Sequence, residues 1–192
     1  MKSATYEEVS NLLGVKVELN QAIDYFIIER FEFNNEIFVC PPSRFSDFTF
    51  GEFIFADMCF IKFTNSKDNY FRDKLCATLY RHERIDFNKQ FHLDTRFPFN
   101  PILITFFSEK FSKLDESLKN LIVVNFSLLR KWIECQYPDV FKKSDRKTTK
   151  PDEEPWLNIR DMLAVNATDI EKIDALQLHD VLFRLNRQTK NG

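Results

Sequence analysis

The chain has 192 residues, of which 44% are hydrophobic and 29% charged, and it contains 22 phenylalanines. This composition is typical of a globular protein and excludes disordered, collagen-like and disulfide-scaffold chains. The 27 basic and 29 acidic side chains give a net charge of −2, too balanced to indicate a nucleic-acid or membrane-surface partner. Residues 1–60 are acidic, with four basic and ten acidic side chains.

Three glycines and seven prolines are too few for the many turns of an all-β protein, so we expect a mainly α-helical fold. The four cysteines are far apart in the sequence, and Cys59 and Cys76 fall in predicted helices. We expect them to be reduced core residues, as in a cytoplasmic protein. Glu7 and Glu8 lie where a signal peptide would be hydrophobic, and no apolar stretch approaches the ~20 residues of a membrane-spanning helix.

The first predicted helix runs from Thr5 to Gly14, because Thr5 and Glu8 have the spacing of a capping box and Gly14 is a typical helix end. Residues 15–39 are ambiguous. Apolar residues alternate in parts of this segment as they do in a strand, whereas its middle has helical character. A small β-hairpin near the N-terminus is one interpretation.

The clearest helix begins at Thr49, whose hydroxyl can cap the backbone while Glu52 returns the hydrogen bond. It continues to Phe63 and is apolar on nearly every side, so other elements or a partner must cover it. A second helix follows the polar break at residues 65–68 and ends near Arg81. Together the two helices predict an antiparallel helical hairpin.

Residues 81–100 have no periodicity and mix cationic with aromatic side chains, so we expect a long loop. Such a mixture is also used by single-stranded nucleic-acid platforms, although acidic residues dilute the charge here and phenylalanine is usually a core residue. Asn100 and Pro101 are typical of a helix start. The longest helix is expected from Asp115 to about Tyr137.

The charged, proline-bracketed segment 142–155 has the composition of a linker. We therefore predict a helical body at residues 1–141, a charged linker at 142–155 and a helical tail at 156–192. In the tail, Thr168 and Glu171 have the spacing of another capping box. A tail this short cannot bury much surface alone, so we expect it to dock on the body or on a partner.

Catalytic and ligand motifs are not evident. The three histidines are His82, His92 and His179, and none lies in a recognised motif. His92 and Asp94 could meet in the loop as a catalytic or metal pair, or as an ordinary hydrogen-bonded pair. His179 lies beside Asp180, where we expect a solvated helix face. The isolated glycines exclude the usual phosphate-binding loops. We therefore expect no enzyme activity, no cofactor and no metal.

Two segments resemble uncharacterised proteins encoded near the tail genes of phages and prophages of Bacteroidetes-type bacteria. These segments are Phe48–Asp57 and Leu75–Arg81. The C-terminal part is similar to the helical ends of tail assembly chaperones, and the similarity is carried by Trp156, Leu163, Ala164, Leu178, Val181 and Leu182. This resemblance implies a small helical protein without catalytic residues that covers an apolar tape-measure protein while the phage tail assembles.

The functional expectation is thus a non-enzymatic, tail assembly chaperone-like protein of the host-cell cytoplasm, binding an apolar helical partner of the tape-measure type. It could also form homo-oligomers. The alternative is a structural subunit of a virion or contractile injection particle, built on the same helices. The residues predicted to bind the partner are Phe53, Phe60, Trp156, Leu163, Leu178 and Leu182.

Overall fold

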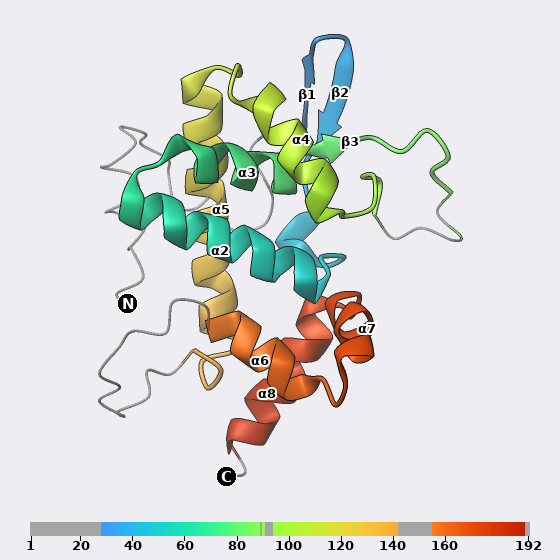
Figure 1. Ribbon diagram of the computed structural model, residues 1–192, viewed down its shortest axis with the longest axis vertical. Coiled ribbons are helices and arrows are strands. Elements are labelled where there is room, and N and C mark those ends of the chain that lie inside the picture. The colour runs from blue at the N-terminus through green and yellow to red at the C-terminus, as the bar shows by residue number, and fades with distance from the viewer. Residues whose placement is uncertain (1–27, 89, 91–93, 142–154, 191–192) are drawn as a thin grey trace.

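The protein is mainly helical, with a small antiparallel sheet near the N-terminus (Figure 1). The computed structural model describes residues 28–88, 90, 94–141 and 155–190. The expected fold class is confirmed, including the β-hairpin near the N-terminus. The helix expected from Thr5 to Gly14 and nearly all of the expected linker lie outside the described residues.

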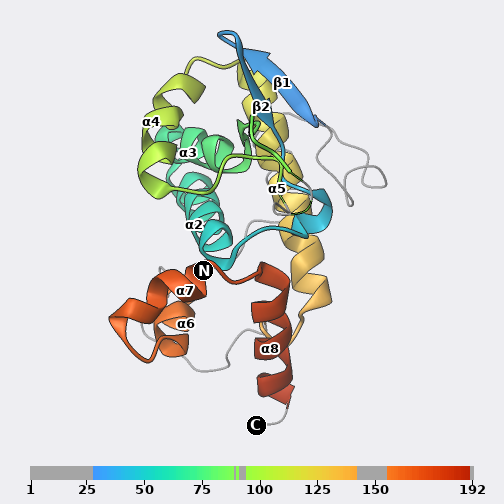
Figure 2. The ribbon, with the colours of Figure 1, turned by 90° about the vertical axis from the view of Figure 1, so that its right-hand side faces the viewer.

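The elements follow one another in a simple order, with the strands at one end of the fold and the C-terminal helices at the other (Figures 1 and 2). They are β1 (Arg30–Phe33), β2 (Glu36–Val39), η1 (Ser43–Phe45), α2 (Phe50–Ser66), α3 (Asn69–Leu79), β3 (Arg81–His82), α4 (Pro101–Phe111), α5 (Glu116–Gln136), α6 (Pro155–Leu163), η2 (Ala167–Asp169), α7 (Ile170–Asp174) and α8 (Leu178–Lys190).

The sheet is built on a tight hairpin. Asn34 and Asn35 both have positive φ, 54° and 61°, as a two-residue turn of the right twist requires. Strand β2 also pairs with β3, where Phe38 lies opposite His82. Residues 95–97 then lie antiparallel beside residues 82–84, because Phe97 donates its backbone N–H to the His82 carbonyl and Arg84 donates to the Thr95 carbonyl, both at 2.8 Å. This pairing makes part of the expected loop a short continuation of the sheet.

Three of the expected helix starts, at Thr49, Asn100 and Asp115, are confirmed. Thr49 Oγ1 accepts a hydrogen bond from the Glu52 backbone at 3.3 Å, and Asn100 Oδ1 accepts from the first turn of α4. Asp115 caps α5 in the same way. These side chains satisfy backbone N–H groups that have no partner inside the helix. The Glu52 carboxylate, however, points into the protein and pairs with arginines, described below.

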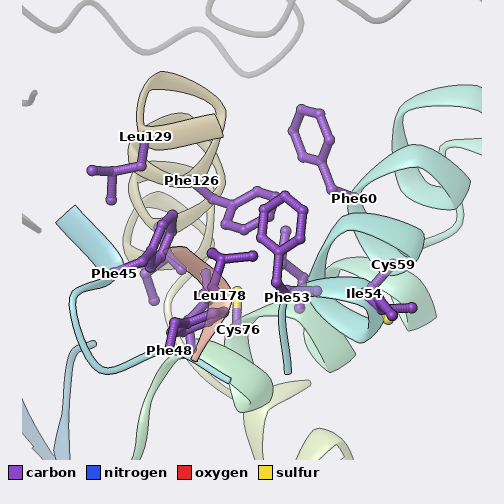
Figure 3. Packing of buried hydrophobic residues seen from close by; sticks show 14 of the residues in the cluster. Phe45, Phe48, Phe53, Ile54, Cys59, Phe60, Cys76, Phe126, Leu129 and Leu178 are labelled. Atoms are coloured by element: carbon purple, nitrogen blue, oxygen red, sulfur yellow. The ribbon is translucent and has the colours of Figure 1, made fainter. Parts of the chain in front are cut away.

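The core lies between α2, α5 and α8 (Figure 3). Phenylalanine rings from α2, α5 and the η1 segment converge there with Leu178 of α8. Helix α5 is the central element, because the nine residues 122–130 are all buried. Helix α2 is covered as well: ten of its 17 residues are buried, including polar Glu52 and Asp57.

The C-terminal helices α6–α8 dock on the body. Thr49 and Gln177 form an isolated antiparallel bridge, flanked by hydrogen bonds of 2.8 Å from Leu178 N to Phe48 O and from Phe50 N to Leu176 O. Main-chain hydrogen bonds therefore join the start of α2 to the start of α8. The body and the tail share one hydrophobic core.

One predicted helix start in the tail is wrong. Helix α7 begins at Ile170 rather than after Thr168, and its N-cap residue is Asp169. The Asp169 carboxylate accepts a hydrogen bond from the Asn166 backbone at 3.1 Å, which closes a turn before the helix.

No helix among the described residues is both long enough and apolar enough to span a bilayer.

Candidate functional site

The residues predicted to bind a partner lie mostly in the interior of the chain. Phe53, Phe60, Trp156, Leu178 and Leu182 are all at most 6% exposed and belong to the shared core. Leu163 is half-buried and packs against the same core. In this conformation, the body and the tail cover each other's apolar faces. The role of these residues in partner binding stays a prediction, and in this conformation they face the interior.

Trp156 of α6 packs closely against α2 of the body. Its ring meets Phe53 edge to face at a centroid distance of 5.2 Å, and its Nε1 donates to Asp57 Oδ2 at 2.8 Å. Asp57 is fully buried on α2, and its other oxygen pairs with Arg130 of α5. A buried carboxylate requires such partners. This network joins α2, α5 and α6.

His179 is another link between tail and body rather than a residue on a solvated face. Its Nδ1 lies 2.8 Å from the Tyr137 hydroxyl, and its Nε2 lies 2.8 Å from the Arg44 carbonyl oxygen. In the neutral ring, Nε2–H donates to the carbonyl and Nδ1 accepts from the hydroxyl. The helical pattern of α8 alone could not reveal this role, because both partners come from distant segments.

The proposed His92–Asp94 pair is not placed, because His92 lies outside the described residues. Asp94 is engaged by arginine: its Oδ2 lies 2.7 Å from Arg96 Nη2 and 3.2 Å from Arg81 Nη2. The same two arginines reach Glu52 Oε1 of α2 at 2.9 and 3.0 Å. Asp94 thus belongs to a four-residue ionic cluster.

Arg96 is the residue that sequence reasoning missed most clearly. It is only 1% exposed, and its guanidinium also donates to the Leu79 carbonyl at 2.8 Å and lies 5.3 Å from the Phe48 ring centroid. Burial of arginine is rare unless it is paired. The proximity of Asp94 in sequence was the only local signal, because Glu52 is far away along the chain. Arg96 anchors the 83–97 segment to the core.

Of the seven large apolar side chains that are exposed in the described part of the body, five lie on α4 or on the segment before it. Ile104, Ser108 and Phe111 form its buried face, while Ile102 is 81% and Phe106 58% exposed. Ile102 and Phe106 are one helical turn apart and so lie on one face. We define the α4 surface by its five exposed apolar members, which are Ile85, Phe97, Ile102, Leu103 and Phe106. The sequence predicted helix α4 and its apolar residues but gave no indication that this face is uncovered.

A pocket of about 230 Å³ opens within the α4 surface, between α4 and the segment that follows β3. We call it the α4 pocket. Most of its wall is apolar and is formed by Ile85, Phe97, Pro98, Leu103, Ile104 and Phe107. The remaining lining residues are Arg81, His82, Glu83 and Asn100. For the loop expected at residues 81–100, the sequence left two interpretations open: core residues or a nucleic-acid platform. Several residues of this loop form one wall of an apolar pocket.

His82 connects the α4 pocket to the sheet. Its ring packs on Phe38 and Phe107, with centroid distances of 4.4 and 4.9 Å, and its Nε2 lies 3.8 Å from Glu36 Oε2. Partial burial lowers the pKa of His82 below its usual value. Lys110 of α4 donates to Glu36 at 2.8 Å, and this hydrogen bond lowers the Glu36 pKa. At neutral pH the pocket wall therefore carries a neutral imidazole beside an ion pair.

The described residues contain no group of three His, Cys, Asp or Glu side chains arranged to hold a metal ion. Cys59 and Cys76 are buried thiols, as expected, and burial raises the pKa of Cys59 to about 12. Such thiols are poor nucleophiles and poor metal ligands, because the reactive form is the thiolate.

No protein-family model, curated protein or solved structure matches this chain. The resemblance to phage tail-module proteins therefore stays a prediction. What the chain can do has to be argued from its own geometry, in which the α4 surface and its pocket are the most prominent exposed apolar features of the described residues.

Proposed function

We propose that this protein binds an apolar helical segment of a protein partner on the α4 surface. It would act as an assembly factor of the type that the resemblance to tail assembly chaperones implies. Isolated exposed apolar residues are normal, whereas contiguous ones mark interfaces. Ile85, Phe97 and Leu103 share one pocket, and Ile102 and Phe106 continue the same face of α4. This contiguity is the observation that carries the proposal.

An apolar helix is the occupant that we propose for the α4 surface. A partner helix presents apolar residues every three or four positions, and such a face docks into an apolar groove beside another helix. Here Ile102 and Phe106 would form one side of the groove, while Phe97 and Ile85 would form the other. Removal of this apolar surface from water would drive binding at about 25 cal/mol per Å². Aromatic contacts such as Phe106 would be the energetic centre.

The proposal moves the partner site away from the tail. Trp156 and Leu178 stabilise the folded chain by holding the tail on the body, and they leave the α4 surface at the other side of α2 free (Figure 2). A tape-measure segment or another apolar assembly protein remains the partner class. A permanent structural subunit would use the same surface and would be recovered by mass spectrometry in purified particles, where a chaperone would be lacking.

The test is fluorescence anisotropy with a labelled peptide of about 18 residues, long enough to be helical, that carries leucines at helical spacing around a central phenylalanine. The double variant Ile102→Ser/Phe106→Ser should weaken binding by about tenfold or more, because it removes two apolar contacts. The matched control is Met162→Ser/Val165→Ser, which changes two exposed apolar residues of the tail. Equal weakening by both double variants, or no binding to the unchanged protein, would contradict the proposal.

A further inference from the structure

The α4 pocket has the size of one side chain. Its volume is about 230 Å³. A protein cavity of about 150 Å³ holds a benzene molecule, whereas pockets for drug-sized ligands usually measure about 300–1,000 Å³. The pocket therefore has room for one aromatic ring or one large aliphatic side chain, and not for a whole cofactor.

Two polar residues of the pocket wall, Asn100 and Glu83, are engaged within the chain. Asn100 Oδ1 accepts the backbone N–H groups of Ile102 and Leu103, at 2.9 and 3.3 Å, so the start of α4 is capped and its donors are used. Glu83 is paired with Arg30 of β1. Neither residue leaves a charge or an open helix end for an ionic ligand.

Among the described residues that line the pocket, Arg81 is the one with a permanent positive charge, and this charge is compensated by Glu52 and Asp94 at 3.0 and 3.2 Å. Its Nε and Nη1 atoms donate no hydrogen bond, but both are enclosed by the protein. Burial lowers the Arg81 pKa to about 10, so the guanidinium is still charged at neutral pH. A ligand carboxylate in the pocket would meet Glu52 and Asp94 already bound to this cation.

We infer that the α4 pocket receives one large uncharged side chain, aromatic or leucine-sized, projecting from the helical segment of the protein partner. The inference rests on the proposed function and names the group that gives that site its specificity. An apolar anchor matches the apolar wall and needs no polar partner. A charged anchor would lose its hydration without gaining an unoccupied counter-charge. The pocket thus selects the partner by size and by absence of charge.

Occupation of the pocket is coupled to the protonation of His82. The groups that face this ring are Glu36 of β2, Lys110 of α4, and the rings of Phe38 and Phe107. An apolar anchor covers the imidazole further and disfavours its charged form. The complex therefore forms best with neutral His82, and affinity falls as the pH drops through the pKa of His82 in the free protein, which lies below about 6.5.

The experiment uses the full chain and the labelled helical peptide described above, with phenylalanine, alanine or glutamate at its central position. The phenylalanine peptide should bind at least about tenfold more tightly than the alanine peptide, because one large apolar side chain is buried. The glutamate peptide should bind more weakly than the alanine peptide. Equal affinity of the three peptides, or tighter binding of the glutamate peptide, would overturn the inference.

Two protein variants locate the effect. Leu103→Trp fills the pocket and should abolish the preference for phenylalanine over alanine. Met162→Trp is the control, because Met162 is exposed on α6, outside the α4 surface and its pocket, so the preference should persist. Circular dichroism checks that both variants keep their helix content. Persistence of the preference in Leu103→Trp would place the anchor elsewhere and refute the inference.

The pH dependence gives an independent readout. Affinity for the phenylalanine peptide should fall as the pH drops through the lowered pKa of His82, by at most about tenfold per pH unit, as one proton requires. His82→Phe keeps an aromatic ring on Phe38 and should remove this dependence. A dependence that survives in His82→Phe would contradict the coupling.

The failure of this inference is distinguishable from the failure of the proposed function. If all three peptides bind equally and Ile102→Ser/Phe106→Ser still weakens them, the α4 surface binds helices but the pocket takes no anchor. If the parent peptide does not bind at all, both proposals fail.

Discussion

Helices α2 and α4 are both rich in large apolar residues, but they differ in how many of these residues the rest of the fold buries. Helix α2 is enclosed by α3, α5 and the docked tail, so Phe53 and Phe60 are buried. Helix α4 packs through one face only, and Ile102 and Phe106 on its other face are exposed. An apolar helix therefore becomes core or surface according to the neighbouring elements that pack against it. Its own sequence does not decide between the two.

The substitution expected to destabilise the protein most is Trp156→Ala, which disrupts the packing of the tail on α2. The change removes the ring that packs on Phe50 and Phe53 and leaves the buried Asp57 without one of its donors. We expect a loss of about 3–5 kcal/mol in the free energy of unfolding, measured by chemical denaturation. Met162→Ala, an exposed position of the same helix, should change it by about 0.5 kcal/mol or less. Equal effects would mean that the tail does not dock as described.

Arg96→Met tests the link between the core and the α4 pocket. It leaves Glu52 and Asp94 with fewer positive partners in a buried site, at a cost of about 3 kcal/mol or more. The variant should also release the 83–97 segment, and limited proteolysis should then cut within that segment first. First cleavage in the tail would contradict the anchoring role of Arg96.

Gly51→Ala could raise or lower the free energy of unfolding, and the direction of the change tests how closely α7 approaches α2. Alanine is favoured over glycine inside a helix by about 0.5–1 kcal/mol, so α2 alone would be stabilised. A Cβ at residue 51, however, would lie 2.7 Å from the Cβ and 3.2 Å from the Cα of Asp174 in α7. We therefore expect a net loss of about 1–3 kcal/mol and looser docking of the tail. Adding Asp174→Gly should recover part of the loss; a stabilised Gly51→Ala protein would show that α7 does not approach α2 this closely.

Thiol labelling perturbs the protein least, because it compares the solvent exposure of the cysteine thiols without changing the sequence. Cys135 is exposed, whereas burial raises the pKa of Cys40 to about 11 and raises those of Cys59 and Cys76 as well. A disulfide reagent at about pH 8 should modify one thiol rapidly and the two buried thiols only after unfolding. Rapid modification of Cys59 would mean that the covered face of α2 opens readily.

The local features of this fold could be predicted from the sequence. The caps at Thr49, Asn100 and Asp115 depend on residues that are close together in the chain, and all three were correctly placed. The hairpin was one of two interpretations left open for residues 15–39, and the structure places it at residues 30–39, where two asparagines with positive φ form the turn. The two-residue strand β3 was missed, because its pairing with β2 joins segments about 40 residues apart and leaves no periodic pattern.

The candidate site could not be predicted, because it depends on which faces remain uncovered. Trp156 and Leu178 have the pattern of a partner-binding helix face, and that face is used within the chain. Leu103 and Phe106 have a similar pattern and remain exposed. Arg96 could not be recognised as a core residue, because its partner Glu52 comes from a distant helix.

Hydrogen–deuterium exchange of the full chain with and without the central-phenylalanine peptide tests the central claim most directly. We expect peptide-dependent protection in residues 97–107, which contain most of the α4 surface, and unchanged exchange in α2 and in the tail residues 156–190. Protection of α2 and the tail with unchanged exchange in α4 would contradict it, and would return the partner site to Phe53, Trp156 and their neighbours.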